Sequence, residues 1–280
     1  HLQYALYKSL KKIEFPTGGY REFTYEPNDY NAAISRWPFG VQNLTTKKIG
    51  GGIRVAKISD FEATGKLAGE VQYFYKSNIA GVTSSGIFSI PQPVYTQNIS
   101  GGRYRLQANS FLPFDRVRSF ITYSTVYEKY ANGSYTKHVL GNFDNGGNDA
   151  LPIFESAPTV YEDQLSYNLN SHKRGLLKSK TDYTDEGIVV NNVEFKYLHQ
   201  DDTDPRRIRL VRIRHNNLAH GTGYRAAAFE EHYYPNQVTE KKEIEYPSGI
   251  QPDPSQVIQT YAYNAENNIR TLKTTNAKGQ

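Results

Sequence analysis

The chain has 280 residues, a formal net charge of +5 and no cysteine. The absence of cysteine excludes disulfides, thiol nucleophiles and metal sites with cysteine ligands. Its 33 basic and 28 acidic residues give a mixed surface, without the dense basic block of a dedicated nucleic-acid binder. No stretch approaches the roughly 20 apolar residues that span a bilayer, so we expect no membrane insertion of this segment.

Aromatic residues give the first indication of the fold class. The chain contains 23 tyrosines and 13 phenylalanines but a single tryptophan, Trp37. Tyrosine combines a flat apolar ring with a polar hydroxyl, which suits a sheet that has one packed face and one wet face. The composition therefore favours a β-rich protein.

The predicted elements, taken in chain order, repeat one unit. Each copy has a basic-rich alternating strand, a turn that contains glycine, and a second strand that ends aromatic-x-aromatic. The first copy has strands at 10–15 and 20–25 around a turn at 16–19. Its alternating pattern predicts that Lys12 and Glu14 face one side of the strand while Ile13 and Phe15 face the other. The turn glycines supply the positive φ that a tight hairpin needs.

Further copies and one additional hairpin follow along the chain. Their turns are expected at Gly65, 131–134, 185–187 and 247–249, and a last turn at 264–268 leads into a final strand at 269–275. The closing aromatic segments of the later copies are 73–75, 195–197 and 261–263. The Asn-Gly pair in 131–134, flanked by alternating strands, is the strongest short hairpin signal.

The segments between the copies are rich in Gly, Pro, Asn and Ser, which predicts loops at 28–52, 78–102, 141–158 and 199–204. Helix signals are thin, and 225–231 is expected to form a helical turn or two at most. The stretch 141–149 suggests a division into regions 1–145 and 146–280, with one continuous domain as the alternative. We therefore expect an all-β fold of tandem antiparallel β-hairpins that form a large twisted or partly wrapped sheet.

Several of these segments resemble a known family. Residues 15–30, 51–58 and 174–183 resemble the large bacterial proteins that carry Rhs-type YD repeats, and residues 260–279 are similar to the YD repeat itself. The tail departs from that repeat because Asn264 stands where aspartate is usual, and Asn267 and Asn268 stand where a glycine is usual. Asparagine tolerates the left-handed conformation, so we still expect the turn to form.

The resemblance implies a β-hairpin array that, in full-length relatives, wraps into a shell or continues as a long sheet. There it encloses or displays another module, often a toxin or adhesion domain. On this basis we expect a non-catalytic structural or interaction segment of a larger protein that is secreted or lies on the cell surface. Its expected partners are other segments of its parent protein, and a glycan or a further protein. The sequence begins at His1 and ends at Gln280 as though cut from a longer chain, so we expect flanking segments.

The most charged segment is 206–214, which reads Arg-Arg-Ile-Arg-Leu-Val-Arg-Ile-Arg. Its apolar phase slips between Leu210 and Val211, which predicts a β-bulge. Four of its arginines are candidates for contacts with phosphate, an acidic glycan or an acidic cargo: Arg207, Arg209, Arg212 and Arg214. The favoured interpretation is an edge strand that its charge protects from aggregation.

The sequence signals for sugar binding, catalysis and metal binding are weaker. Trp37 is a candidate for sugar stacking and makes a surface glycan-binding module the alternative function. An enzyme such as a glycoside hydrolase is the least expected function, because no nucleophile elbow, P-loop or dinucleotide fingerprint nominates a residue. His215, His220 and His232 lie near one another in sequence but form no recognised metal motif, so we expect neither a metal nor a cofactor.

Overall fold

The computed structural model describes residues 5–36, 39–89, 96–100, 103–107, 120–150, 154–155, 169–198, 207–218, 221–232, 236–246 and 254–276. In this part of the chain the named elements are β-strands and one short 3-10 helix, Ser171–Lys173. The strands are β1 (Lys12–Glu14), β2 (Tyr20–Arg36), β3 (Phe39–Phe61), β4 (Leu67–Phe74), β5 (Gly86–Phe88), β6 (Thr96–Ser100), β7 (Arg103–Gln107), β8 (Ile121–Tyr123), β9 (Thr125–Tyr130), β10 (Tyr135–Leu140), β11 (Phe154–Glu155), β12 (Leu177–Tyr183), β13 (Val189–Tyr197), β14 (Arg207–Leu218), β15 (Gly221–His232), β16 (Val238–Glu245), β17 (Ser255–Tyr263) and β18 (Ile269–Asn276). The predicted all-β fold class is confirmed.

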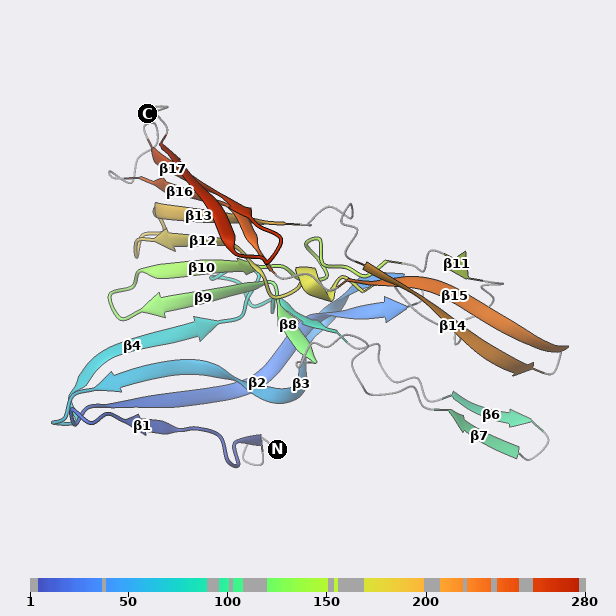
Figure 1. Ribbon diagram of the computed structural model, residues 1–280. Helices are drawn as coiled ribbons and strands as arrows, with labels where there is room; N and C mark the ends of the chain where they lie inside the picture. The colour runs from blue at the N-terminus through green and yellow to red at the C-terminus, as the bar shows by residue number, and fades with distance from the viewer. Residues whose placement is uncertain are drawn as a thin grey trace.

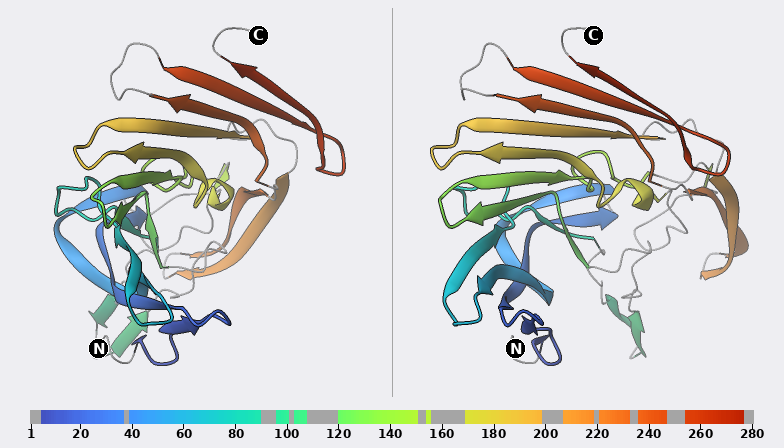
Figure 2. Two further views of the ribbon diagram at one scale, coloured as in Figure 1. Left: turned by 90° about the vertical axis from the view of Figure 1, so that its left-hand side faces the viewer. Right: turned by 60° about the vertical axis from the view of Figure 1, so that its left-hand side comes forward.

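Most strands belong to one large open sheet. Its order is β18-β17-β16-β13-β12-β10-β9-β4-β3-β2-β5-β8, with β1 paired to β2 beside this path. Its pairings are antiparallel except for that of β2 with β5, which makes the sheet mixed. Figure 1 shows these strands stacked from β17 down to β1, while β14 and β15 extend to one side. The stack bends between its C-terminal and N-terminal ends (Figure 2).

Five hairpin turns share one hydrogen-bond pattern. In each, the first residue's N–H donates to the carbonyl of the fifth residue, and the fourth residue's N–H donates to the carbonyl of the first. The turns span 15–19, 62–66, 130–134, 184–188 and 264–268. Their fourth residues have φ of 92° at Gly18, 82° at Gly65, 89° at Gly133, 86° at Gly187 and 65° at Asn267. The left-handed Asn267 confirms that asparagine can replace glycine there. The predicted turn at 247–249 lies outside the described residues.

Four tyrosines fasten the hairpin units in the same way. The closing tyrosine of each predicted copy donates its hydroxyl to a backbone carbonyl near the start of that copy's first strand. The pairs are Tyr25 with Leu10 at 2.6 Å, Tyr75 with Val55 at 2.8 Å, Tyr197 with Leu177 at 2.9 Å and Tyr263 with Val238 at 2.7 Å. We call this contact the tyrosine clasp. It explains why each copy ends in aromatic-x-aromatic, because the last ring carries the hydroxyl that reaches across the unit.

Aromatic pairs also join neighbouring hairpins near the turns. Tyr20 follows the first turn and stacks on Phe61, with ring centroids 4.7 Å apart. Tyr135 stacks on Tyr183 at 4.6 Å in the same manner. In both cases the stacked residues are direct cross-strand partners. Such pairs are the side-chain unit of sheet stabilisation.

The most buried apolar residues gather where the second half of β2 meets β5. Ala32 and Ile34 of β2 pack with Ile87 of β5 and with Phe143. By contrast, every residue of β1 is exposed, so Ile13 does not lie on a buried face. The expectation that one side of this strand faces a packed interior is therefore not met, since Ile13 is 37% exposed and Phe15 42%. The core positions the far half of β2 and the polar residues beside it.

Several sequence predictions are corrected. Of the predicted loop at 28–52, the described residues 28–36 and 39–52 belong to the paired strands β2 and β3, because backbone hydrogen bonds hold Gly- and Asn-rich segments as well as apolar ones. Residues 225–231 lie in strand β15 and not in a helical turn. β14 pairs with β15 from Arg207 to Leu218 without a register shift, so the predicted bulge at Leu210–Val211 is absent.

The large sheet crosses the division suggested between 1–145 and 146–280. β10 lies before that boundary and pairs with β12, which lies after it. The contact continues one step beyond the paired strands, because the N–H of Gly141 donates to the carbonyl of Leu176. No helix in the described residues is long and apolar enough to cross a bilayer.

Candidate functional site

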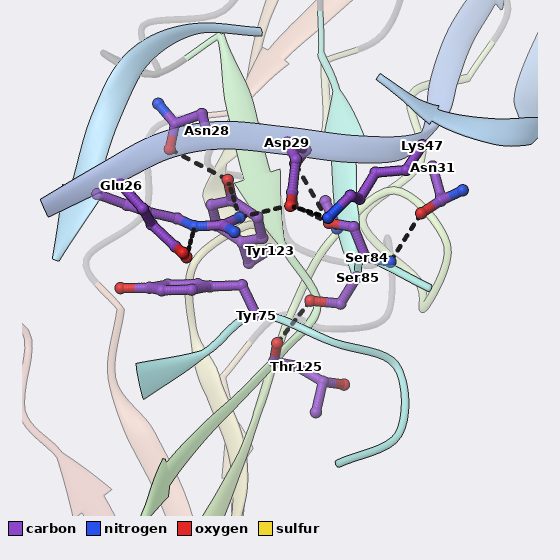
Figure 3. Close-up of polar contacts among 12 residues, drawn as sticks. Glu26, Asn28, Asp29, Asn31, Lys47, Tyr75, Ser84, Ser85, Tyr123 and Thr125 are labelled. Atoms are coloured by element: carbon purple, nitrogen blue, oxygen red, sulfur yellow. Dashed lines mark hydrogen bonds and ion pairs between the residues drawn. The ribbon is translucent and has the colours of Figure 1, made fainter. Parts of the chain in front are cut away.

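A buried group of charged residues lies where β2, β3 and β8 approach the segment before β5 (Figure 3). Asp29 on β2 is only 6% exposed. The side chain of Arg54 on β3 is 10% exposed, although a guanidinium cannot lose its charge in a protein. A buried charge is stable only when oppositely charged or polar partners surround it. We call this group the Arg54 cluster.

Arg54 holds two carboxylates and two aromatic rings. Its Nε lies 2.6 Å from Glu26 Oε1, and its Nη1 lies 2.7 Å from Asp29 Oδ1. The same Nη1 donates to the hydroxyl oxygen of Tyr123 at 2.8 Å. The guanidinium also lies 4.4 Å from the ring centre of Tyr75 and 5.0 Å from that of Tyr123. This combination of ion pairs and cation–π contacts compensates for the loss of water around the charge.

Asp29 is saturated by further donors. Ser84 Oγ donates to Asp29 Oδ1 at 2.6 Å, and Lys47 Nζ lies 3.1 Å from Oδ2. Ser84 is itself held in place, because its N–H donates to Asn31 Oδ1 at 2.7 Å and its Oγ accepts the Gly86 N–H at 3.0 Å. The carboxylate thus ties the loop before β5 to β2.

Electrostatics follow from this geometry. Burial alone would raise the pKa of Asp29, but hydrogen bonds from Arg54 and Ser84 and the charge of Arg54 outweigh burial and hold that pKa below its usual value. The pKa of Arg54 is raised, since its carboxylate and Tyr123 partners outweigh the effect of burial. Burial raises the pKa of Tyr75 and of Tyr123. Asp29 is therefore ionised and both tyrosines are neutral at physiological pH.

This chemistry suits cross-linking better than proton transfer. A catalytic general acid needs a carboxyl group with a raised pKa, whereas Asp29 has a lowered one. Each oxygen of Asp29 is engaged by Arg54, Ser84 or Lys47. The cluster joins segments that lie far apart in the sequence, as Arg54 and Tyr123 do, and we interpret it as the structural centre of this part of the sheet.

A second buried polar cluster closes the loop after β10. Asn142 is fully buried and accepts a hydrogen bond from Thr122 at 2.8 Å. Arg174 Nη1 donates to the Gly147 carbonyl at 2.7 Å and lies 2.6 Å from Asp149 Oδ1, while its guanidinium rests 4.1 Å from the ring centre of Phe143. Lys178 donates to the carbonyl of Asn145. The chain's own cations thus bind the oxygen atoms of this loop.

The residues nominated from the sequence lie elsewhere. Trp37 is outside the described residues. Four arginines are placed on one strand, β14: Arg207, Arg209, Arg212 and Arg214. Of these, Arg209 has a described contact, a 3.0 Å ion pair with Glu230 in which Arg209 is 72% exposed and Glu230 8%. β14 stands at the end of the order β11-β15-β14, which confirms that it is an edge strand.

Two of the three histidines named in the sequence lie far apart on the ribbon, and His220 lies outside the described residues. His215 pairs with Tyr224 near the turn end of the β14–β15 ladder, whereas His232 pairs with Arg207 at its opposite end. Among the described residues no group of three or more His, Asp or Glu side chains is arranged to hold a metal ion.

Sequence reasoning missed the Arg54 cluster. Asp29 fell inside a predicted loop, and Arg54 occupied an ordinary polar position in an alternating strand. Arg54 meets Asp29 across 25 positions and Tyr123 across 69 positions of the chain. No spacing of residues within a short segment predicts contacts over such sequence separations. No protein-family model, curated protein or solved structure matches the chain.

Proposed function

We propose that this chain is a non-catalytic structural and interaction segment of a larger exported YD-repeat protein, in which it serves as scaffold or shell. The observation that carries the proposal is the tyrosine clasp, which recurs in four hairpin units. Units that bind mainly to their neighbours build extended curved surfaces, which is the usual role of repeat architectures.

The use of buried polar groups supports the same role. The Arg54 cluster and the second buried polar cluster, which surrounds Arg174, both connect segments of the chain to one another. Binding and catalytic sites instead hold polar groups ready for a ligand. Here Asp29 and Arg54 already bind each other at 2.7 Å, and their separation would leave two buried charges without compensation.

The scaffold role is tested on the folded chain with glycan arrays and hydrolase substrates, together with hydrogen exchange. We expect no saturable glycan binding, no turnover, and slow exchange shared by strands β9, β10, β12 and β13 as one cooperative group. Glycan binding that disappears in Trp37→Ala would replace the proposal with the glycan-binding alternative. Turnover of an oligosaccharide would replace it with an enzyme.

The proposed location is tested in cells that make the parent protein. An antibody against the folded chain should label intact cells or recover the protein from the medium. Labelling that requires permeabilised cells, with no protein outside, contradicts an exported scaffold.

A further inference from the structure

β14 presents a long backbone edge. It pairs with β15 along all of its residues from Arg207 to Leu218, with no register shift. Within the described part of the chain no strand pairs with its other side. Such an edge presents a row of unused N–H and C=O groups, which is a template for a further strand.

Aliphatic side chains are exposed on both faces of this strand. Ile208 is 49% exposed, Val211 65% and Ile213 65%. Alternate residues of a strand point to opposite faces, so Ile208 lies on one face while Val211 and Ile213 lie on the other. A partner that packs on one face would leave the other face uncovered. A strand added at the edge brings cross-strand neighbours to both faces.

The charge of β14 specifies what kind of strand would fit. Its sequence, Arg-Ile-Arg-Leu-Val-Arg-Ile-Arg-His-Asn-Asn-Leu, has four arginines and no acidic residue. At one position the inner neighbour shows the complementary choice, because Glu230 of β15 is the direct partner of Arg209 and pairs with it at 3.0 Å, whereas Arg214 stands opposite Arg225. A strand on the outer side with glutamate or aspartate opposite each arginine would repeat the Arg209 arrangement.

We propose that the free edge of β14 binds an extended acidic peptide segment, which adds a strand to the β11-β15-β14 sheet. This inference rests on the proposed scaffold role and names the partner class that the scaffold would hold. Backbone hydrogen bonds provide the affinity, while the order of arginines and aliphatic residues along β14 selects a strand with acidic residues opposite the arginines and apolar residues opposite Ile208, Val211 and Ile213. A nucleic acid or an acidic glycan would use the arginines but neither the backbone edge nor Ile208, Val211 and Ile213.

The test measures fluorescence anisotropy with a labelled eight-residue peptide, Glu-Val-Glu-Val-Val-Glu-Val-Glu, whose order complements positions 207–214 of β14. We expect saturable binding to the wild-type chain and at least about tenfold weaker binding to the double variant Arg212→Glu, Arg214→Glu, since charge reversal turns attraction into repulsion. The matched control is Arg270→Glu, Lys273→Glu on β18, which is also a terminal strand of its sheet. This control should bind the peptide like the wild type.

Three results would overturn the proposal. A peptide with the same glutamates but proline in place of valine cannot form strand hydrogen bonds, and equal binding of it would mean attraction by charge alone. Stronger binding of a sulfated oligosaccharide, lost in the β14 variant, would assign the strand to a different class of partner. Self-association of the chain that the β14 variant abolishes would assign the edge to a second copy. Circular dichroism of each variant separates these outcomes from failure of the scaffold to fold.

Discussion

The hairpin units of the large sheet and the β14–β15 ribbon use the same strand geometry but are held together in different ways. In the large sheet, tyrosine clasps and stacked aromatic pairs cross-link neighbouring strands. In the ribbon, an unbroken ladder joins β14 to β15 while Val211 and Ile213 remain largely exposed. Among the described residues, side-chain cross-links are therefore prominent in the large sheet, and a continuous backbone ladder is prominent in the ribbon.

This difference indicates which contacts stabilise a sheet that has only a small cluster of buried apolar residues. The small cluster of Ala32, Ile34, Ile87 and Phe143 lies near the end of the large sheet, away from β16 to β18. The Arg54 cluster reinforces the sheet beside this apolar cluster, and the hairpin units farther along the sheet are held locally by their clasps. Substitutions that remove these contacts should weaken the large sheet, whereas comparable changes in the ribbon should have little effect.

The largest effect is expected for Arg54→Met. It removes the shared cation of Asp29 and Glu26 and leaves the buried Asp29 carboxylate with only Ser84 and the half-exposed Lys47, which should lower the free energy of unfolding by about 3–5 kcal/mol. Urea unfolding measures this loss. The control is Arg21→Met, because Arg21 pairs with Asp60 on the surface, with side chains 42% and 40% exposed, and should cost less than about 1 kcal/mol. Equal losses for the two variants would contradict a special role for the Arg54 cluster.

Acid should weaken the same cluster. The pKa of Asp29 is lowered in the folded chain, so its stabilising contribution is complete above the unfolded-state pKa of about 3.9 and is lost as pH falls through the folded-state value. We expect the urea midpoint to fall between about pH 5 and pH 2, and Arg54→Met to lose this part of the acid sensitivity. An unchanged pH profile in that variant would show that other carboxylates control acid unfolding.

A matched pair of valines compares the two regions directly. Val193 on β13 is 5% exposed, whereas Val211 on β14 is 65% exposed. Threonine has nearly the same shape as valine but adds a hydroxyl, so Val193→Thr should cost about 1–3 kcal/mol and Val211→Thr no more than about 0.5 kcal/mol. Thermal unfolding of both variants measures the difference. A large cost at Val211 would mean that the ribbon is covered in the folded chain.

The sequence predicted the hairpin units well because their signals are local. Glycine at the fourth turn position and alternation along strands of a few residues suffice to place the turns at Gly65, Gly133 and Gly187. Asn267 obeys the same rule for the same conformational reason. The β14 prediction failed in part because the period-two rule assumes one buried face, and β14 exposes Ile208 and Val211 on opposite faces.

The Arg54 cluster, by contrast, could not be predicted from local sequence. Its partners come from β2, β8 and the segment before β5, and their meeting depends on the path of the whole sheet. Residues 28–52 read as a loop because Gly50, Gly51 and Gly52 are typical of turns. In the structure Gly50 accommodates a close approach, since a Cβ there would lie 2.1 Å from Ile121 Cδ1, whereas Gly52 has φ of 84° and a Cβ at Gly51 would meet nothing within 4 Å. The composition of this segment indicates that glycine is needed, but not whether a turn or a close approach requires it.

The hairpin turns at Gly65 and Asn267 provide a comparison in which smaller changes in stability are expected. Gly65 has φ of 82° and no atom within 4 Å of the position of a Cβ, so Gly65→Ala tests backbone strain alone and should cost about 1 kcal/mol. Asn267 has φ of 65° in the equivalent turn, and Asn267→Gly should change stability by only a few tenths of a kcal/mol. Chemical unfolding of both variants measures the pair. A neutral Gly65→Ala would contradict the left-handed turn.

The clasps should give small individual effects, and a double variant tests whether neighbouring clasps act together. Tyr197→Phe and Tyr263→Phe each remove one hydroxyl donor to a carbonyl and should each cost about 1 kcal/mol or less. The control Tyr261→Phe loses a hydrogen bond to the side chain of Gln259 and leaves the clasp intact. Val238, which accepts the Tyr263 hydroxyl, is the direct cross-strand partner of Tyr197, so the loss in the double variant should differ from the sum of the single losses by at least about 0.5 kcal/mol. Burial raises the pKa of Tyr197 and of Tyr263, so the clasps should persist below the unfolded-state tyrosine pKa of about 10 and weaken as pH rises through the folded-state values. An alkaline unfolding transition that is unchanged in the double variant would show that the clasps are incidental to the array.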